Sequence, residues 1–193
     1  MRWFGGCAPS DGNTPVPAGA ALLWSAPPLW TVGPWAEQRV RTYEGGGVRL
    51  AVIGACSADP TELAEAAHAF DPTSVTESWA GSFTVVRSFQ NKVEIITDIS
   101  GACPVYTTRS GDGHIVWGSS SRALAALNGY GIDREWLAAY LGDKHAVPSN
   151  RSAWTGVHPV PPGHRLTLKS GSMTMGRWWR STTRPRTEAL DRI

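Results

Sequence analysis

The sequence has few cysteines, and they are not spaced as metal ligands or as a disulfide framework would be. Among its 193 residues there are three, Cys7, Cys56 and Cys103, and no two of them form a Cys-x-x-Cys pair. The five histidines show no metal-ligand spacing either. Zinc sites and disulfide-rich domains depend on such spacings. The sequence therefore predicts neither a metal site nor a disulfide framework.

Long hydrophobic runs and a marked excess of one charge are also lacking. No run approaches the roughly 20 apolar residues of a membrane-spanning helix, and the opening MRWFGG lacks the apolar core of a signal peptide. Eighteen basic and 16 acidic residues give a formal net charge of +2, which is no electrostatic footprint for a nucleic acid or an anionic membrane. Because 41% of the residues are hydrophobic, we expect one folded, cytoplasmic domain with neither of these partners.

Short strands dominate the local pattern. We expect strands where β-branched and aromatic residues cluster between Gly, Pro or Asn, at 2–6, 21–24, 29–32, 48–53, 81–87, 92–97, 103–108, 114–118, 165–168 and 172–178. Residues 7–19 are rich in Pro and Gly and predict an exposed loop.

Helices are predicted at three main places. Asp59 has Pro60 directly after it and Glu62 three residues on, which is typical of a capped helix over 61–70. Further capped helices are expected over 119–127 and 134–141, the second stopped by Gly142. Residues 181–186 predict a linker, and 187–193 the start of another helix with no stop signal, so we expect the natural protein to continue.

Six features in order between Ala80 and Trp179 resemble the glutamine-amidotransferase half of asparagine synthetases and their relatives. The family's Gly-x-Phe strand, Asp-x-x-Gly-x-x-Pro-Leu-Tyr turn, strand-to-helix corner, Leu-Ala-x-Tyr-Leu helix, Gly-Ile-x-x-Leu-Pro-Pro-Gly-His segment and closing Tyr-Trp are matched here by AGSF (80–83), TDISGACPVY (97–106), WGSSSRAL (117–124), DREWLAAYL (133–141), GVHPVPPGH (156–164) and RWW (177–179). The resemblance implies an α+β fold, an Ntn-hydrolase-like four-layer αββα sandwich of two antiparallel sheets. It places this amidotransferase-like domain at 1–180, with a linker and the start of a synthetase domain at 181–193.

The catalytic pattern of that family is incomplete. Members that hydrolyse glutamine use an N-terminal cysteine whose thiolate attacks the amide, and in this alignment Arg2 occupies its position. The resemblance therefore implies no catalytic residue, with Cys7 as a remote alternative if the first six residues were removed. The family's glutamine-holding Asn-Gly-Glu falls at Ile53, Gly54 and Ala55, where only the glycine remains.

Three residues are candidates for what is left of the substrate pocket. They are Arg49, Gly54 and Asp98. A lone arginine beside a buried strand is more often a rim or packing residue than a carboxylate clamp, so Arg49 keeps both interpretations.

Among relatives without the nucleophile, the sequence resembles lasso peptide macrolactam cyclases most. The cyclases have similar sequences at three places: the opening FGG (4–6), the strand WAGSF (79–83) and the segment VPPGHRL (160–166). The resemblance implies an ATP-dependent carbon–nitrogen ligase that adenylates an Asp or Glu side chain of a precursor peptide and closes an isopeptide ring. ATP and Mg²⁺ would be bound by a synthetase domain outside this chain and none by this fragment, which alone would be inactive. The implied partners are that C-terminal synthetase domain, the precursor peptide and its processing proteins.

Two alternatives remain open at this point. One is an ordinary glutamine-hydrolysing asparagine synthetase, which requires a free N-terminal cysteine. The other is a stand-alone, non-catalytic binding or scaffold module.

Overall fold

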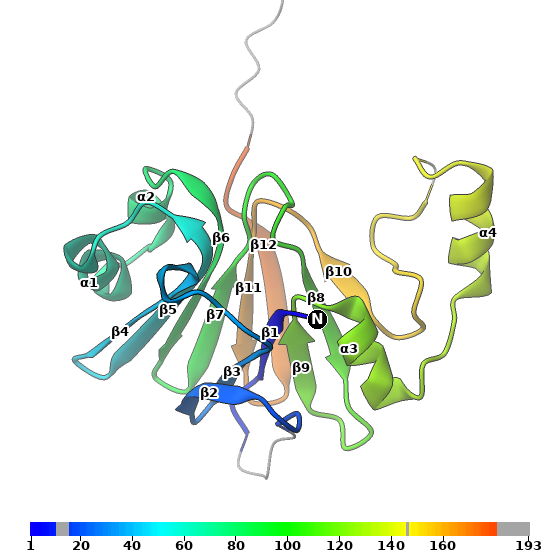
Figure 1. Cartoon of the computed structure of the whole chain (residues 1–193), viewed down its shortest axis with the longest axis horizontal. Coiled ribbons are helices and arrows are strands. Elements are labelled where there is room, and N and C mark those ends of the chain that lie inside the picture. The colour runs from blue at the N-terminus through cyan, green and yellow to red at the C-terminus, as the bar shows by residue number, and fades with distance from the viewer. Residues whose placement is uncertain (11–15, 146, 181–193) are drawn as a thin grey trace, which may run out of the picture.

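Two antiparallel six-stranded sheets, packed face to face, form the centre of the molecule (Figure 1). The computed structural model describes residues 1–10, 16–145 and 147–180. The first sheet, sheet A, has the order β10-β8-β9-β1-β3-β2. Its strands are β1 (Trp3–Cys7), β2 (Ala21–Ser25), β3 (Pro28–Val32), β8 (Val105–Arg109), β9 (Ile115–Gly118) and β10 (His158–Val160).

The second sheet, sheet B, has the order β12-β11-β7-β6-β5-β4; β4–β5, β6–β7 and β11–β12 are hairpins, whereas β8, β9 and β10 of sheet A intervene in the chain between β7 and β11. Its strands are β4 (Val40–Gly45), β5 (Val48–Cys56), β6 (Gly81–Phe89), β7 (Lys92–Ile96), β11 (His164–Lys169) and β12 (Ser172–Arg177). The turn between β6 and β7 uses Gln90 and Asn91, both at positive φ, as a two-residue hairpin connection requires.

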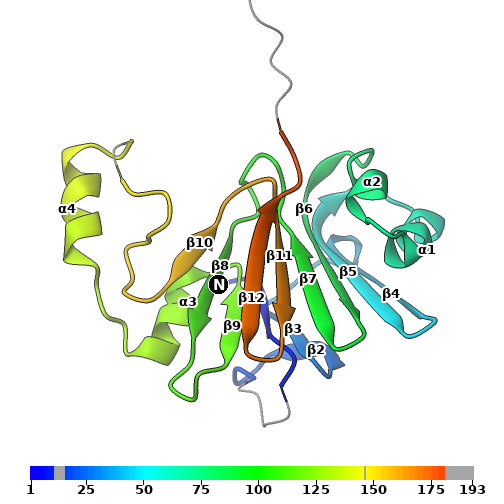
Figure 2. The same cartoon turned by 180° about the vertical axis from the view of Figure 1, so that it is seen from behind.

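Helices cover the outer face of each sheet. On sheet B these are α1 (Pro60–His68) and the single turn α2 (Thr73–Thr76), and on sheet A α3 (Ser121–Ala125) is followed by a 3₁₀ turn, Ala126–Asn128. Another 3₁₀ turn, Glu37–Arg39, precedes β4. The helix α4 (Arg134–Gly142) projects to one side of the sandwich and has no buried residue (Figures 1 and 2).

Three hydrophobic clusters follow from this layering. The largest lies between the sheets, and its biggest members are Phe4, Trp24, Leu29, Ile53, Ile95, Trp117, Leu166 and Leu168. A second cluster joins α1 to the outer face of sheet B, and a third joins α3 to the outer face of sheet A. These layers confirm the predicted α+β fold of two antiparallel sheets with helices outside.

The capping prediction for α1 is confirmed in detail. The Asp59 carboxylate accepts hydrogen bonds from the backbone of Thr61 and Glu62, and the Glu62 side chain accepts one from the backbone of Asp59. This reciprocal pair satisfies N–H groups that have no partner inside the helix. The helix ends at His68, two residues before the predicted end.

Two local predictions are wrong. Cys7 belongs to β1 and is 1% exposed, although its Pro- and Gly-rich neighbours predicted an exposed loop; pairing with β9 and cover from α3 override that composition. Gly142 is the last residue of α4 rather than its stop, and Asp143 in extended conformation ends the helix. The predicted linker at 181–186 and helix at 187–193 lie outside the described residues. Within the described part of the chain, no helix is long and apolar enough to cross a membrane.

Candidate functional site

Arg2, which the family resemblance aligns with the nucleophile, stands directly before β1. The guanidinium of Arg2 lies over the ring of Trp35, 4.7 Å from its centroid. Trp35 in turn meets Phe4 edge-on at 6.0 Å between ring centroids and donates its indole N–H to the carbonyl of Val32. Side chains alternate along a strand, so Arg2 and Phe4 share the inner face of sheet A. The inner end of β1 thus carries a guanidinium and no thiol.

Cys7 lies on the other face of the same strand. Its side chain packs with Trp30, Val116 and Leu124 in the cluster beneath α3, and its backbone pairs with Val116 of β9. Burial raises the pKa of the Cys7 thiol to about 12, so the thiol stays protonated at neutral pH and is a poor nucleophile.

Gly54, in β5, has a structural reason to be glycine. Its φ of +135° is one that other residues rarely adopt, and a Cβ would lie 2.7 Å from Cα of Phe83 and against the carbonyl oxygen of Ser82. Its neighbours Ile53, fully buried, and Ala55 offer no polar group to a ligand. The backbone at this position therefore requires glycine, and its neighbours are apolar.

The Asp98 carboxylate is fully engaged by its own turn. It accepts hydrogen bonds from the hydroxyls of Ser82, at 2.5 Å, and Ser100, at 2.6 Å, and from the backbone N–H of Gly101, at 2.6 Å. The Asp98 carbonyl also accepts from Gly163. Asp98 therefore holds the turn between β7 and β8 against the Pro-Pro-Gly segment.

Ser82 links Asp98 to Cys103, whose thiol donates to the Ser82 carbonyl at 3.4 Å. Burial raises the pKa of this thiol, which a hydrogen bond from Ser82 partly offsets. Neither Ser82 nor Cys103 was singled out from the sequence as a site residue, although Ser82 stands inside the AGSF motif.

Arg2, Gly54 and Asp98 belong to one end of the sandwich. Val32, the last residue of β3, pairs with Trp3, and Val40, the first of β4, pairs with Ile53; a short segment that includes Trp35 joins them. Beside Gly54, Ala55 pairs with Ser82, the partner of Asp98. Gly54 and the Ser82–Asp98 pair are thus neighbours, and residues 33–39 connect their end of sheet B to the start of β1.

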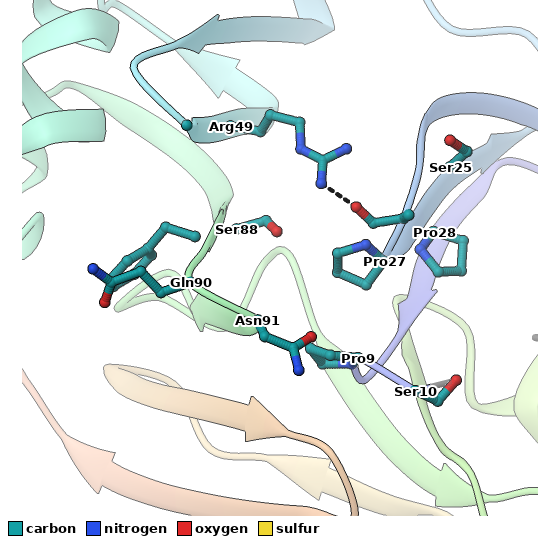
Figure 3. Close-up of a pocket in the computed structure, with 12 residues that line it drawn as sticks. Pro9, Ser10, Ser25, Pro27, Pro28, Arg49, Ser88, Gln90 and Asn91 are labelled. Carbon is teal, nitrogen blue, oxygen red and sulfur yellow. Dashed lines mark hydrogen bonds between the residues drawn. The ribbon is translucent and has the colours of Figure 1, made fainter. Parts of the chain in front are cut away.

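Arg49 lies away from this end, at the start of β5. Gly54 is five residue steps further along the strand, about 16 Å at 3.3 Å per residue. Its guanidinium donates to the carbonyl of Ala26 and lies 5.5 Å from the ring centroid of Trp24. Figure 3 shows the Arg49 side chain extending toward Pro27 and Pro28 across a cavity of about 330 Å³. Ser88, Gln90 and Asn91 also line this cavity. Arg49 is a packing residue of this rim, and it does not join Gly54 and Asp98.

Two glycine-containing strings that resemble a phosphate-binding loop in composition, RSGD (109–112) and KSGS (169–172), are hairpin turns. Residues 169–172 connect β11 to β12, and 109–112 belong to the turn between β8 and β9. A phosphate loop feeds a helix N-terminus with its backbone amides, and neither turn does so. Within residues 1–10, 16–145 and 147–180, no group of three His, Cys, Asp or Glu side chains could hold a metal ion.

Comparison with known proteins gives one family. The model of the glutamine amidotransferase domain family matches residues 46–179, more than half of the chain. No curated protein sequence matches the chain.

Two solved structures resemble the fold. The allosteric regulatory enzyme of purine biosynthesis is 11% identical with a TM-score of 0.51 over 93% of this chain. The glutamine phosphoribosylpyrophosphate amidotransferase from B. subtilis, complexed with ADP and GMP, is 13% identical with a TM-score of 0.49 over 81% of this chain. The chain covers only 43% and 36% of these two solved chains, respectively. Two stacked antiparallel sheets with the Asp98 turn and the strand end at Gly54, together with the family match, establish that the chain belongs to the glutamine amidotransferase domain family and has its Ntn-hydrolase-like fold.

Proposed function

We propose that this domain is a glutaminase-inactive part of an ATP-dependent amide ligase of the asparagine-synthetase type, and that the ligase closes the macrolactam ring of a lasso peptide. The proposal that the domain does not hydrolyse glutamine is supported by the positions of the Arg2 and Cys7 side chains at β1. Arg2 lies on the inner face, stacked on Trp35, while the thiol of Cys7 lies on the outer face beneath α3. Hydrolysis of glutamine by a cysteine nucleophile needs an accessible thiolate, and neither position supplies one.

Removal of the first six residues does not rescue Cys7 as a nucleophile. Trp3, Phe4, Gly5 and Gly6 pair with β3, and Gly5 and Gly6 also pair with β9, in the middle of sheet A. Cleavage before Cys7 would remove these ladders and still leave the thiol on the outer face. Loss of the nucleophile together with the polar groups beside Gly54 supports a ligase that takes its nitrogen from an amine already present in its substrate.

The second half of the proposal is supported by the ordered motifs from 80 to 179. Ring closure on a peptide amine requires no free ammonia, which agrees with a pocket without a nucleophile. ATP and Mg²⁺ belong in this proposal to a synthetase domain outside the chain, because the described residues supply no loop for the phosphates. The peptide, its processing proteins and that synthetase domain are the proposed partners.

ATP–pyrophosphate exchange by the full-length product of the same gene tests this function. Exchange that depends on a candidate precursor peptide, with a product lighter than the peptide by one water, is the result we expect. Exchange that depends on free aspartate, together with an intact mass showing an N-terminal cysteine, would instead identify a glutamine-dependent asparagine synthetase. No exchange with either substrate would favour a non-catalytic binding module.

A further inference from the structure

The edge strand β12 exposes two methionines on the face that should be interior. In the ladder with β11, Met173 stands opposite Leu168 and Met175 opposite Leu166. Opposite residues in an antiparallel pair project to the same face, and both leucines are buried in the cluster between the sheets. Met173 and Met175 are nevertheless 45% and 53% exposed. The inner face of sheet B is therefore uncovered at this edge.

Among the described residues, no strand pairs with the outer edge of β12. β12 is the last strand of sheet B, and all six of its residues are exposed. Its pairing with β11 runs through six consecutive residues without a bulge, and it contains no proline. Natural edge strands are usually blunted by bulges, prolines or inward charges, so this strand can accept another strand beside it. Figure 2 shows β12 in front, at the open side of the sandwich.

Sheet A supplies the opposite wall. A cavity of about 640 Å³ lies between Met173 and the ends of β8, β9 and β10, and its lining includes Thr107, Arg109, Ile115 and His158. β10, the edge strand of sheet A, has only three residues. Sheet A is therefore too short at this edge to cover the two methionines of β12. The methionines, the free strand edge and the cavity together form one groove, which we call the β12 groove.

The charge of the β12 groove selects an occupant. Arg109 and His158 are the ionisable side chains among the described residues that line the cavity, and Arg177, which ends β12, shares the face of Met173 and Met175. No carboxylate lines the cavity. An acidic chain is therefore complementary to the groove, and apolar side chains on it would cover the two methionines.

We propose that the β12 groove binds an extended acidic peptide, which adds as a strand to the edge of sheet B. Strand addition of this kind combines main-chain hydrogen bonds with alternate side chains that enter pockets. Apolar side chains of the peptide contact Met173 and Met175, and its carboxylates lie toward Arg109 and Arg177. The inference goes beyond ring formation and does not depend on it, since binding is measured without ATP or turnover.

Fluorescence anisotropy with the whole chain and a dye-labelled acetyl-Val-Asp-Val-Glu-Val-Thr amide tests the proposal. We expect saturable binding that weakens when both acidic residues are replaced by lysine, and that is lost when alternate backbone nitrogens are methylated. Methylation removes the N–H groups that pair with β12 and leaves charge and side chains intact.

Variants locate the site. Met173→Thr with Met175→Thr should weaken binding about tenfold, because the apolar wall is lost, whereas Thr174→Met on the opposite face of the same strand should leave it unchanged. Arg109→Gln should weaken the acidic peptide about threefold and leave the lysine peptide unaffected. Circular dichroism confirms that each variant is folded.

Three outcomes would overturn the proposal. One is the absence of saturable binding, and another is binding that survives both the methionine double variant and backbone methylation. The third is that the chain binds no peptide but forms a dimer in sedimentation velocity, and that the methionine double variant abolishes this dimer. The occupant of the β12 groove would then be a second copy of this chain.

Discussion

Arg2 and Trp35 form a cation–π contact, with the guanidinium carbon 4.7 Å from the ring centroid, at the position that we aligned with the family's nucleophile. Such contacts contribute about 0.5–1 kcal/mol at exposed sites. The contact joins β1 to the segment that leads into β4, so the end of the sandwich near Gly54 is held together without any catalytic group.

Cys7 should be chemically silent in the folded protein. Because burial raises the pKa of its thiol to about 12, the thiolate fraction at pH 8 is negligible and the side chain is inaccessible under α3. Iodoacetamide followed by peptide mass mapping should leave Cys7 unmodified in native protein and label it fully in urea. Rapid native labelling of Cys7, ahead of the half-buried Cys56 and Cys103, would contradict its placement.

Gly54→Ala should destabilise the fold by about 2 kcal/mol or more. The new Cβ would meet Ser82 and Phe83 backbone atoms at a φ of +135°, and strained conformations of this kind cost about 1–3 kcal/mol before any clash is counted. Urea denaturation measures the difference in the free energy of unfolding.

Gly142→Ala is the matched control, since nothing lies within 4 Å of a Cβ at that position in α4 and alanine favours a helix by about 1 kcal/mol. Equal effects of the two substitutions would show that Gly54 is not held by its backbone geometry.

Removing the charge of only one partner of the buried ion pair Arg87–Glu94 should destabilise the fold. The two residues stand opposite each other in the β6–β7 ladder, with Arg87 Nε and Nη2 at 2.9 and 2.5 Å from one oxygen of Glu94. Glu94→Gln should lower the free energy of unfolding by about 3 kcal/mol, because a buried guanidinium loses its counter-charge.

Glu44→Gln on exposed β4 should change stability by less than about 0.5 kcal/mol, and the double replacement Arg87→Met with Glu94→Leu should cost less than Glu94→Gln alone. A larger loss in the double variant would mean that the pair is not the source of the effect.

Stability should fall in acid partly through Asp133. Hydrogen bonds from the backbone of Trp136 and from the side chain of Arg151 lower the pKa of the Asp133 carboxyl below its usual value. A carboxyl with a lowered folded-state pKa stabilises the fold above its unfolded pKa of about 3.9, and that contribution disappears as pH falls through the folded value.

Wild type should therefore be more stable than Asp133→Asn at pH 6, and the two should converge below about pH 4. Urea titrations across this range measure the difference. A gap that stays constant down to pH 2 would show that the charge on Asp133 has no part in it.

Local sequence signals predicted most of the elements. The hairpins around Gln90 and Lys169 and the capped start of α1 depend on neighbours in the chain, and they are found as predicted. The single turn α2 was missed, because its Thr-Ser-Val-Thr sequence is too short for any helical period. β1 runs one residue further than predicted because pairing with β9 extends it through Cys7.

The sequence predicted which positions belong to the candidate site, but not the contacts that their side chains make. The family order of motifs marked Arg2, Gly54 and Asp98, and the structure brings these to one end. Contacts between distant residues could not be read from the sequence: Trp35 under Arg2 and Ser82 beneath Asp98 come from strand pairing. Arg49, considered a clamp or a packing residue, lies at the other end of β5 because a straight strand separates it from Gly54.

Glutamine hydrolysis is the most direct test of the central claim that this amidotransferase fold carries no working glutaminase. The chain is incubated with glutamine and, in parallel, with an electrophilic glutamine analogue, and glutamate release and intact mass are followed against an active glutaminase as control. The account predicts no glutamate above the buffer blank and no covalent adduct. Glutamate release that disappears in Cys7→Ser, with an adduct on Cys7, would contradict it.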